Sequence, residues 1–135
     1  MSFVVDTSAI AAVLLQEDDA EHFRQYLDKY LYPVVSTATL HELYCVSRRE
    51  SVIEGAKQIE QLLSLIEPEL VPFDVEQLRA ARDAYAHYGR GSGHRANLNM
   101  GDCFAYALAR TRGLPLLFKG DDFVHTDIEP ALKPA

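Results

Sequence analysis

Five acidic side chains stand near the expected ends of strands and starts of helices, where they could share one site. Carboxylates gathered in this way bind hard divalent cations such as Mg²⁺ and Mn²⁺, which prefer oxygen ligands. Without a counter-charge such a group cannot stay fully ionised, because mutual repulsion raises some of the pKa values. No His and Cys set has the spacing of a zinc site, and no phosphate-binding glycine loop is present. The five acids are Asp6, Glu42, Asp102, Asp121 and Asp122.

Local structural roles compete with a metal-binding role for several acids of the chain. Asp6 could serve as a helix N-cap, accepting a hydrogen bond from the backbone at the start of the next helix. Glu42 could close a capping box with Thr39, in which the Glu side chain bonds back to the first residue of the helix. Asp74 is most simply a helix N-cap, with Gln77 completing a capping box, so we leave Asp74 outside the candidate site.

Apolar periodicity predicts that short strands alternate with helices along the chain. In the helix expected from residue 74, the apolar positions are Val75, Leu78, Ala81 and Tyr85. Gly113 suits the residue that follows the last helix, and Pro115 prevents that helix from continuing. The expected strands are residues 3–5, 34–36, 70–73 and 116–118, and the expected helices are residues 9–15, 20–31, 37–49, 52–66, 74–87 and 102–112.

This alternation predicts an α/β fold with three α/β/α layers, in which helices flank a short-stranded central parallel sheet. In such sheets ligands bind outside the carboxyl ends of the strands. Asp6 directly follows the first strand, Glu42 lies in the helix after the second, and Asp121 and Asp122 follow the last. Asp102 opens the helix before the last strand, and such a helix starts near that strand's carboxyl end. All five acids are therefore expected on one rim of the sheet.

Composition indicates one globular domain over residues 1–135. Hydrophobic residues make up 48% of the chain and charged residues 24%, a balance that favours a folded core over disorder. No apolar run approaches the length of a membrane span, and no signal peptide is recognised, so we expect a cytoplasmic protein without a membrane. Cys45 and Cys103 both fall within expected helices, which argues against a disulfide framework. The net charge of -7 normally disfavours nucleic-acid binding, but a bound divalent cation would supply local positive charge.

The stretch from Tyr88 to Asn99 breaks every periodicity, and its three glycines indicate a loop. Arg90, His94 and Arg95 make it the one locally basic stretch near the acidic start of the last helix. The loop is either a solvated connection or a segment that contacts substrate, and the sequence favours neither interpretation.

Three stretches, together with Glu42, carry a resemblance to a known family. They read VVDTSA at residues 4–9, LNMGDCFAYALA at 98–109 and LLFKGDDF at 116–123. Over essentially its full length the chain resembles a PIN-domain ribonuclease, specifically a VapC-type toxin of a type II toxin–antitoxin system. The resemblance implies a metal-dependent endoribonuclease that hydrolyses RNA phosphodiesters with a metal-activated water.

The resemblance also implies roles for individual residues. Asp6, Glu42 and Asp102 match the acids that hold Mg²⁺, for which Mn²⁺ is the expected substitute. Asp121 and Asp122 compete to be the fourth acid, and Asp121 is the preferred candidate. Further matches are Ser8, a hydroxyl that orients the first Asp, and three candidates for phosphate contact, Arg90, Arg95 and Lys119. The implied partners are the RNA substrate, a cognate antitoxin protein and a second copy of the chain in a homodimer.

Two other functions fit part of the pattern. A flavodoxin-like phosphoacceptor signalling module also needs acids at strand ends, and Asp74 and Lys119 would suit it. That function, however, wants paired acids after the first strand, where Thr7 follows Asp6, and it leaves Asp102 without a role. A catalytically dead PIN-like scaffold that only binds a partner is the second alternative, and the retained acids argue against it.

Overall fold

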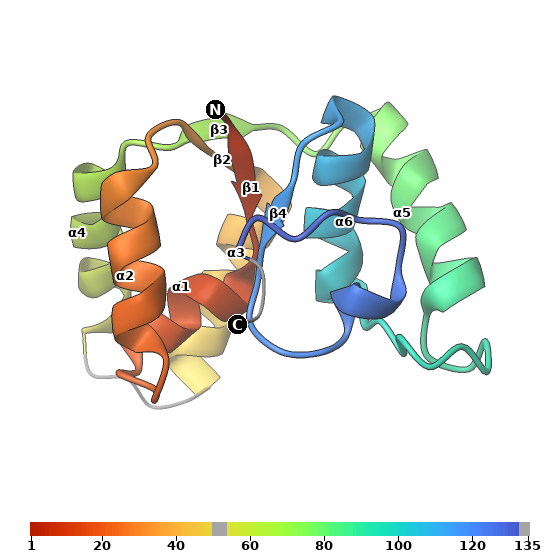
Figure 1. Ribbon diagram of the computed structural model, residues 1–135, viewed down its shortest axis with the longest axis horizontal. Helices are drawn as coiled ribbons and strands as arrows, with labels where there is room; N and C mark the ends of the chain where they lie inside the picture. Colours follow the sequence, from red (N-terminus) through yellow and green to blue (C-terminus); the bar gives the residue numbers. More distant parts are fainter. Residues whose placement is uncertain (50–53, 133–135) are drawn as a thin grey trace.

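The computed structural model describes residues 1–49 and 54–132 of the chain. Its centre is a four-stranded sheet in the order β3-β2-β1-β4, and every strand pair is parallel (Figure 1). The order places β1 and β2 in the middle, which brings the residues after these two strands to the centre of the rim. The strands are β1 (Phe3–Val5), β2 (Pro33–Ser36), β3 (Glu69–Val71) and β4 (Leu116–Leu117).

Helices cover both faces of the sheet, which confirms the three-layer α/β/α architecture. Helices α5 and α6 lie side by side on one face, and α1, α2 and α4 lie on the other (Figure 1). The helices are α1 (Thr7–Leu14), α2 (Ala20–Lys29), α3 (Thr37–Arg49), α4 (Gly55–Ile66), α5 (Val75–Tyr88) and α6 (Met100–Arg112), and a short 3-10 helix η1 (Phe123–His125) follows β4.

The alternation of side chains along each strand explains why both faces need helices. Val4 and Val34 point to the core beneath α5 and α6, whereas Val5 and Val35 point to the core beneath α1 and α2. Because neighbouring strand residues face opposite sides, an apolar run is buried on both sides at once. The short strands therefore lie in the interior, and their polar continuations emerge at the rim.

The structure corrects the extents of several expected elements. Strand β3 begins at Glu69 and ends at Val71, so it lies earlier than the expected residues 70–73, and β4 ends at Leu117. The helix expected over residues 52–66 is observed as Gly55–Ile66, and the first part of the expected span falls outside the described residues. No helix in the described ranges is long and apolar enough to cross a membrane.

Helix α5 buries only one of its four expected apolar positions. Ala81 packs inward as expected, together with Gln77 and Ala84, whereas Val75, Leu78 and Tyr85 are exposed. Small side chains on this inward face allow α5 to lie close against α6, and a larger apolar side chain would hold the two helices apart. The larger apolar residues of the expected stripe thus lie on the surface.

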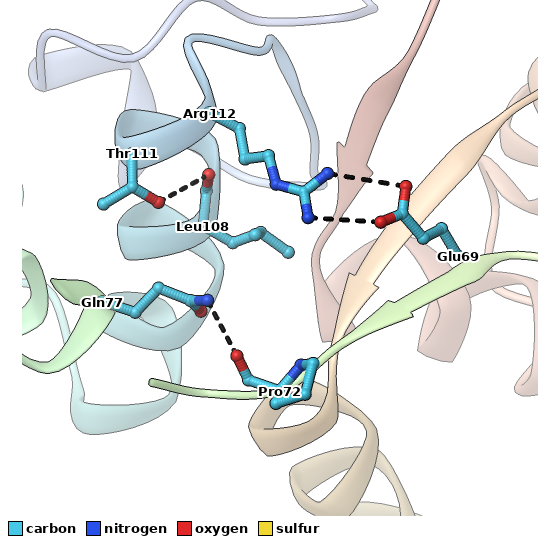
Figure 2. A network of polar contacts seen from close by, with 6 residues as sticks. All are labelled: Glu69, Pro72, Gln77, Leu108, Thr111 and Arg112. Atoms are coloured by element: carbon cyan, nitrogen blue, oxygen red, sulfur yellow. Dashed lines mark hydrogen bonds and ion pairs between the residues drawn. The ribbon is translucent and has the colours of Figure 1, made fainter. Parts of the chain in front are cut away.

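Side-chain bonds fix α5 and α6 to the β3 edge of the sheet (Figure 2). Gln77 Nε2 donates to the carbonyl of Pro72 at 2.9 Å, so Gln77 does not complete the expected capping box with its side chain. Asp74 nevertheless caps α5, accepting from the backbone N–H of Gln77 at 2.9 Å. At the C-terminal end of α6, the guanidinium of Arg112 lies 3.2 Å from the Glu69 carboxylate on β3.

Candidate active site

Asp6 begins the site, at the point where β1 ends and α1 begins. It is the N-cap of α1, and its Oδ2 accepts from the backbone N–H of Ser8 at 3.0 Å and from the Ser8 hydroxyl at 2.6 Å. The Asp6 backbone N–H donates to the carbonyl of Leu117 at 2.9 Å, which anchors the residue to β4. The side chain is only 3% exposed. The capping role accounts for the hydrogen bonds to Oδ2, but it does not explain why the carboxylate is buried.

Burial dominates the electrostatics of Asp6 and raises the pKa of its carboxyl to about 7. The hydrogen bonds from Ser8 lower that pKa, and the charges of Asp102 and Glu42 raise it. A carboxylate that is buried beside two other acids needs positive charge nearby if it is to stay ionised at neutral pH. Asp6 is therefore held in an environment that favours a cation.

Ser8 joins Asp6 to the segment after β4. Its hydroxyl donates to Asp6 and accepts from the backbone N–H of Lys119 at 2.9 Å, across 111 residues of sequence. One hydroxyl thus fixes the orientation of the buried carboxylate and the course of the chain that leads to Asp121 and Asp122. The structure gives Ser8 this orienting position beside Asp6.

Glu42 is held by α1 and not by the start of its own helix. Its Oε1 accepts from the Thr7 hydroxyl at 2.5 Å. Helix α3 begins at Thr37, and the Ser36 hydroxyl accepts from the backbone N–H of Ala38 at 3.1 Å at that end. The capping box between Thr39 and Glu42 is therefore wrong, because Thr39 lies inside the helix. Freed from a capping role, the Glu42 carboxylate points toward α6.

Gly101 gives Glu42 the room to approach α6. A Cβ atom on Gly101 would overlap the Glu42 carboxylate, so a larger residue at this second position of the helix would displace the Glu42 side chain. The close approach explains why the charge of Glu42 raises the pKa of Asp102, the next residue of α6. The sequence pattern Gly-Asp at the helix start thus combines an acid with the space for a second acid.

Asp102 is positioned by a capping box at the start of α6. Its backbone N–H donates to Asn99 Oδ1 at 2.8 Å, and its Oδ2 accepts from the backbone N–H of Asn99 at 2.9 Å. Burial raises the pKa of the Asp102 carboxyl to about 6, the Asn99 N–H lowers it, and the charges of Asp122 and Glu42 raise it. Arg90 lowers the same pKa. The pKa of Asp102 therefore depends on both the acids of the rim and an arginine of the basic loop.

Asp121 and Asp122 follow β4 and are both exposed. The charge of Asp122 acts on Asp102 more strongly than that of Glu42 does. Asp121 does not appear among the groups that shift the pKa of Asp6 or Asp102. By proximity to the other acids, Asp122 is thus the better placed of the two for the fourth position.

The three candidates for phosphate contact differ in whether an acidic side chain already pairs with them. The Lys119 ammonium pairs with Glu17 at 2.9 Å and with Asp19 at 3.1 Å, so two carboxylates already engage it. Arg90 lies close enough to affect Asp102, and Arg95 is exposed on the same loop. The arginines of the loop are therefore better placed than Lys119 to meet a phosphate.

The loop that carries these arginines is well ordered by hydrogen bonds. The Arg90 N–H donates to the carbonyl of Leu98 at 2.9 Å, and the Leu98 N–H donates to the carbonyl of Tyr88 at 3.0 Å. His94 Nδ1 accepts from the N–H of Ala96 at 3.1 Å. These bonds fix the course of the backbone that carries Arg90 and Arg95.

The three central acids share one arrangement, in which a donor engages one oxygen of each carboxylate. The engaged oxygens are Asp6 Oδ2, Glu42 Oε1 and Asp102 Oδ2. In the described part of the chain, no hydrogen bond engages the other oxygen of any of the three. Carboxylates oriented by one hydrogen bond, with the second oxygen available, suit a hard divalent cation.

Carboxylate oxygens are suitable ligands for such an ion, although these residues do not form a complete coordination site. Within residues 1–49 and 54–132, no three His, Cys, Asp or Glu side chains lie in a ready arrangement for a metal. Mg²⁺ usually takes only one or two carboxylates and keeps several waters, so a looser set of acids is compatible with it. Asp6, Glu42, Asp102 and Asp122 are the residues that could hold the ion.

Comparison with known proteins identifies the family of this arrangement. The PIN domain family profile matches residues 3–129. The chain belongs to the PIN-domain family. Ribonuclease VapC42 of Mycobacterium tuberculosis is 42% identical to it over 128 residues, which cover 95% of this chain and 98% of the relative. Ribonuclease VapC28 of the same organism is 46% identical over 131 residues, which cover 96% and 97%. The chain is thus a PIN-domain protein of the VapC ribonuclease type.

Solved PIN-domain structures confirm the fold. Mycobacterium tuberculosis VapC20, described as a sarcin-ricin loop cleaving toxin, aligns with a TM-score of 0.73 at 18% identity and covers 95% of this chain and 99% of its own. VapBC2 from Rickettsia felis, bound to a DNA fragment from its promoter, aligns with a TM-score of 0.70 at 16% identity and covers 96% of each chain. At these identities the likeness concerns the fold alone.

Sequence reasoning missed three residues that build this PIN-domain site. Thr7 was passed over beside Asp6, although it supplies the donor for Glu42. Gly101 was read as part of a motif without a physical role, and Asn99 was assigned to the loop. Asn99 could have been found, since an Asn three residues before an Asp resembles a capping box. The roles of Thr7 and Gly101 depend on a partner about 35 and 59 residues away and leave no local signal.

Proposed function

We propose that this PIN-domain chain cleaves RNA as an endoribonuclease that depends on Mg²⁺ or Mn²⁺ bound by Asp6, Glu42, Asp102 and Asp122. One observation carries the proposal: three buried or half-buried carboxylates, at the start of α1, in α3 and in α6, each have one oxygen fixed by a donor, and the charge of Glu42 raises the pKa of both Asp6 and Asp102. When bound, such an ion makes a water nucleophilic at neutral pH and offsets charge on the phosphate.

The protein's own residues supply orientation and charge. Ser8 holds Asp6 through two hydrogen bonds, and Thr7 holds Glu42 through one, so both carboxylates enter the reaction with fixed geometry. Fixed donors and acceptors cost no reorganisation when the phosphate reacts. Arg90, beside Asp102, is placed to contact a phosphate oxygen of the RNA, which positions the strand without reading its sequence.

Purified protein incubated with RNA in Mg²⁺, Mn²⁺ or EDTA tests this function, together with the variant Asp6→Asn. We expect cleavage with either metal, none in EDTA and none with Asp6→Asn, since Asn keeps the volume but removes the charge. The matched control is Asp74→Asn, which retains a good N-cap for α5 outside the acidic cluster. Cleavage that persists in EDTA, or at a normal rate with Asp6→Asn, would contradict the proposal.

We also propose that an antitoxin protein inhibits the chain by binding along its surface. Two similar folds were solved as a toxin–antitoxin complex from Klebsiella pneumoniae, with a TM-score of 0.66, and as VapBC2. An apolar cavity of about 240 Å³ between α2 and α4 suits an amphipathic segment of such a partner. Leu31 and Leu65 border it and are 63% and 82% exposed. Leu65→Asp should weaken antitoxin binding without reducing RNA cleavage by the free protein.

A homodimer is the remaining partner that we propose. Leu70 on β3 is exposed, as are Val75, Leu78 and Tyr85 on the adjoining α5, and together they form an apolar surface that a second copy would cover. Analytical ultracentrifugation of the wild type and of Leu78→Asp tests this assembly. We expect a dimer for the wild type and a monomer for the variant. A monomeric wild type at high concentration would exclude the dimer.

A further inference from the structure

A polar cavity of about 320 Å³, separate from the apolar one between α2 and α4, lies between α5, α6 and the segment after η1. The acidic cluster does not contribute to its lining. Ala80 and Ala84 of α5 line it and leave the space open because their side chains are small. Its charged, aromatic and hydroxyl lining residues are Asp83, His87, Tyr88, Tyr106, Arg110 and Asp127.

One stripe of α6 connects this cavity to the active site. Asp102, Tyr106 and Arg110 follow one another at intervals of four residues, which places them on the same face of the helix. Each interval advances about 6 Å along the helix axis. Tyr106, which lines the cavity, thus lies about one helical turn from Asp102 along the axis of α6.

Hydrogen bonds hold the polar wall of the cavity in place. The Tyr106 hydroxyl donates to Asp127 Oδ1 at 2.7 Å, and Arg110 Nε lies 3.6 Å from Asp127 Oδ2. Among the described residues, no hydrogen bond engages the two terminal nitrogens of Arg110, and its side chain is 63% exposed. The wall thus offers an acceptor carboxylate and a planar donor group side by side.

Aromatic rings form the other wall. His87 and Tyr88 have ring centroids 4.4 Å apart, Tyr88 and His94 4.8 Å, and Tyr88 and Tyr106 6.0 Å. His87 is exposed at the end of α5, and its ring centroid also lies 5.5 Å from that of His94. Arg90 and Arg95 on the same loop add positive charge next to the rings. This combination of rings, fixed donors, acceptors and nearby cations is the chemistry that recognises unstacked bases of single-stranded RNA.

We propose that this cavity binds an unstacked base of the RNA substrate next to the phosphate that is cleaved. The proposal rests on the proposed ribonuclease function, and it adds a place where the enzyme contacts a base in addition to the backbone. His87 stacks on the base, Arg110 donates to its edge and Asp127 accepts from it. Phosphate contacts by the loop arginines position the strand, and the cavity contributes sequence preference.

Equilibrium binding tests the proposal in a way that does not require cleavage. Fluorescence anisotropy would measure the affinity of the full chain in EDTA for a labelled short RNA of mixed sequence and for an abasic ribose-phosphate strand of the same length. The variants are His87→Ala, Arg110→Ala and Arg110→Lys. Arg79→Ala is the matched control, because it removes an exposed arginine of α5 that does not line the cavity.

We expect His87→Ala and Arg110→Ala to weaken binding of the base-bearing RNA about tenfold and to leave binding of the abasic strand nearly unchanged. Arg110→Lys should not restore affinity, because an ammonium lacks the planar fork that pairs with a base edge. Arg79→Ala should match the wild type on both strands.

Three outcomes would contradict the proposal that this cavity binds a base. One is an equal loss of affinity for both strands, which would make Arg110 a phosphate contact. Another is restoration by Arg110→Lys, and the third is no effect of either alanine variant. RNA cleavage is measured separately, so active enzyme with an inert cavity rejects only this inference. If the alanine variants lose affinity only for the base-bearing RNA but the wild type cleaves no RNA, only the proposed hydrolysis is rejected.

Discussion

The hydroxyl of Thr7 donates a hydrogen bond of 2.5 Å to Oε1 of Glu42, which lies 35 residues further along the chain. The bond joins the first residue of α1 to α3 and fixes a carboxylate beside the buried Asp6. Residues that orient a metal-binding carboxylate are often worth as much as the ligand itself. The geometry of the cluster therefore depends on a residue with no charge.

Thr7→Val should lower RNA cleavage about tenfold or more while the protein stays folded, because valine keeps the shape and removes the donor. Thr7→Ser should keep most of the activity, since it retains the hydroxyl. Single-turnover cleavage rates and thermal unfolding of both variants check this expectation. If Thr7→Val cleaves RNA at the wild-type rate, the hydrogen bond to Glu42 has no part in the reaction.

Gly101→Ala should abolish most activity, because the added methyl group would displace the Glu42 carboxylate from its place against α6. The double variant Gly101→Ala with Glu42→Ala should regain thermal stability relative to Gly101→Ala, since the overlap disappears, but it should remain inactive. Melting temperature and cleavage rate, measured on the same samples, separate the two effects. Full activity of Gly101→Ala would show that Glu42 does not need this position.

Asp122→Asn should reduce cleavage more than Asp121→Asn does, because the charge of Asp122 acts on Asp102 and that of Asp121 does not. The two residues are neighbours with similar exposure, so each variant serves as a control for the other. Thermal shift on addition of Mn²⁺ provides a second measurement, with a smaller shift expected for Asp122→Asn. The reverse ranking would restore Asp121 as the fourth acid.

The two cysteines should differ sharply in reactivity toward iodoacetamide. Burial and, to a smaller extent, the charge of Asp102 raise the pKa of the Cys103 thiol to about 12, so almost no thiolate forms at pH 8. Cys45 is exposed on α3. Since the thiolate is the reactive form, mass spectrometry of the folded protein should find label on Cys45 alone, and denaturant should expose both. Rapid labelling of Cys103 in the folded state would contradict the packing of α6.

Much of the fold was readable in the sequence because its cues are local. Short apolar runs marked the strands, and Gly113, with φ of 64°, ended α6 as expected. The cues failed where packing decides: helix α5 buries Gln77 and Ala84, which were not expected to face the core, and exposes Val75 and Leu78, which were. Apolar periodicity does not state which of two faces meets a neighbouring helix, because close helix packing also favours small residues.

The sequence by itself determined the chemistry of the candidate site and the rim on which it lies. Carboxylate types and their order relative to strands are properties of the chain, and the topology of a parallel sheet carries them to one edge. Only the tertiary structure decided which groups meet across the rim: Thr7 beside Glu42, and Asp122 rather than Asp121 near Asp102. Such choices depend on distances of a few ångströms between residues remote in sequence, and these distances exist only once the helices have packed.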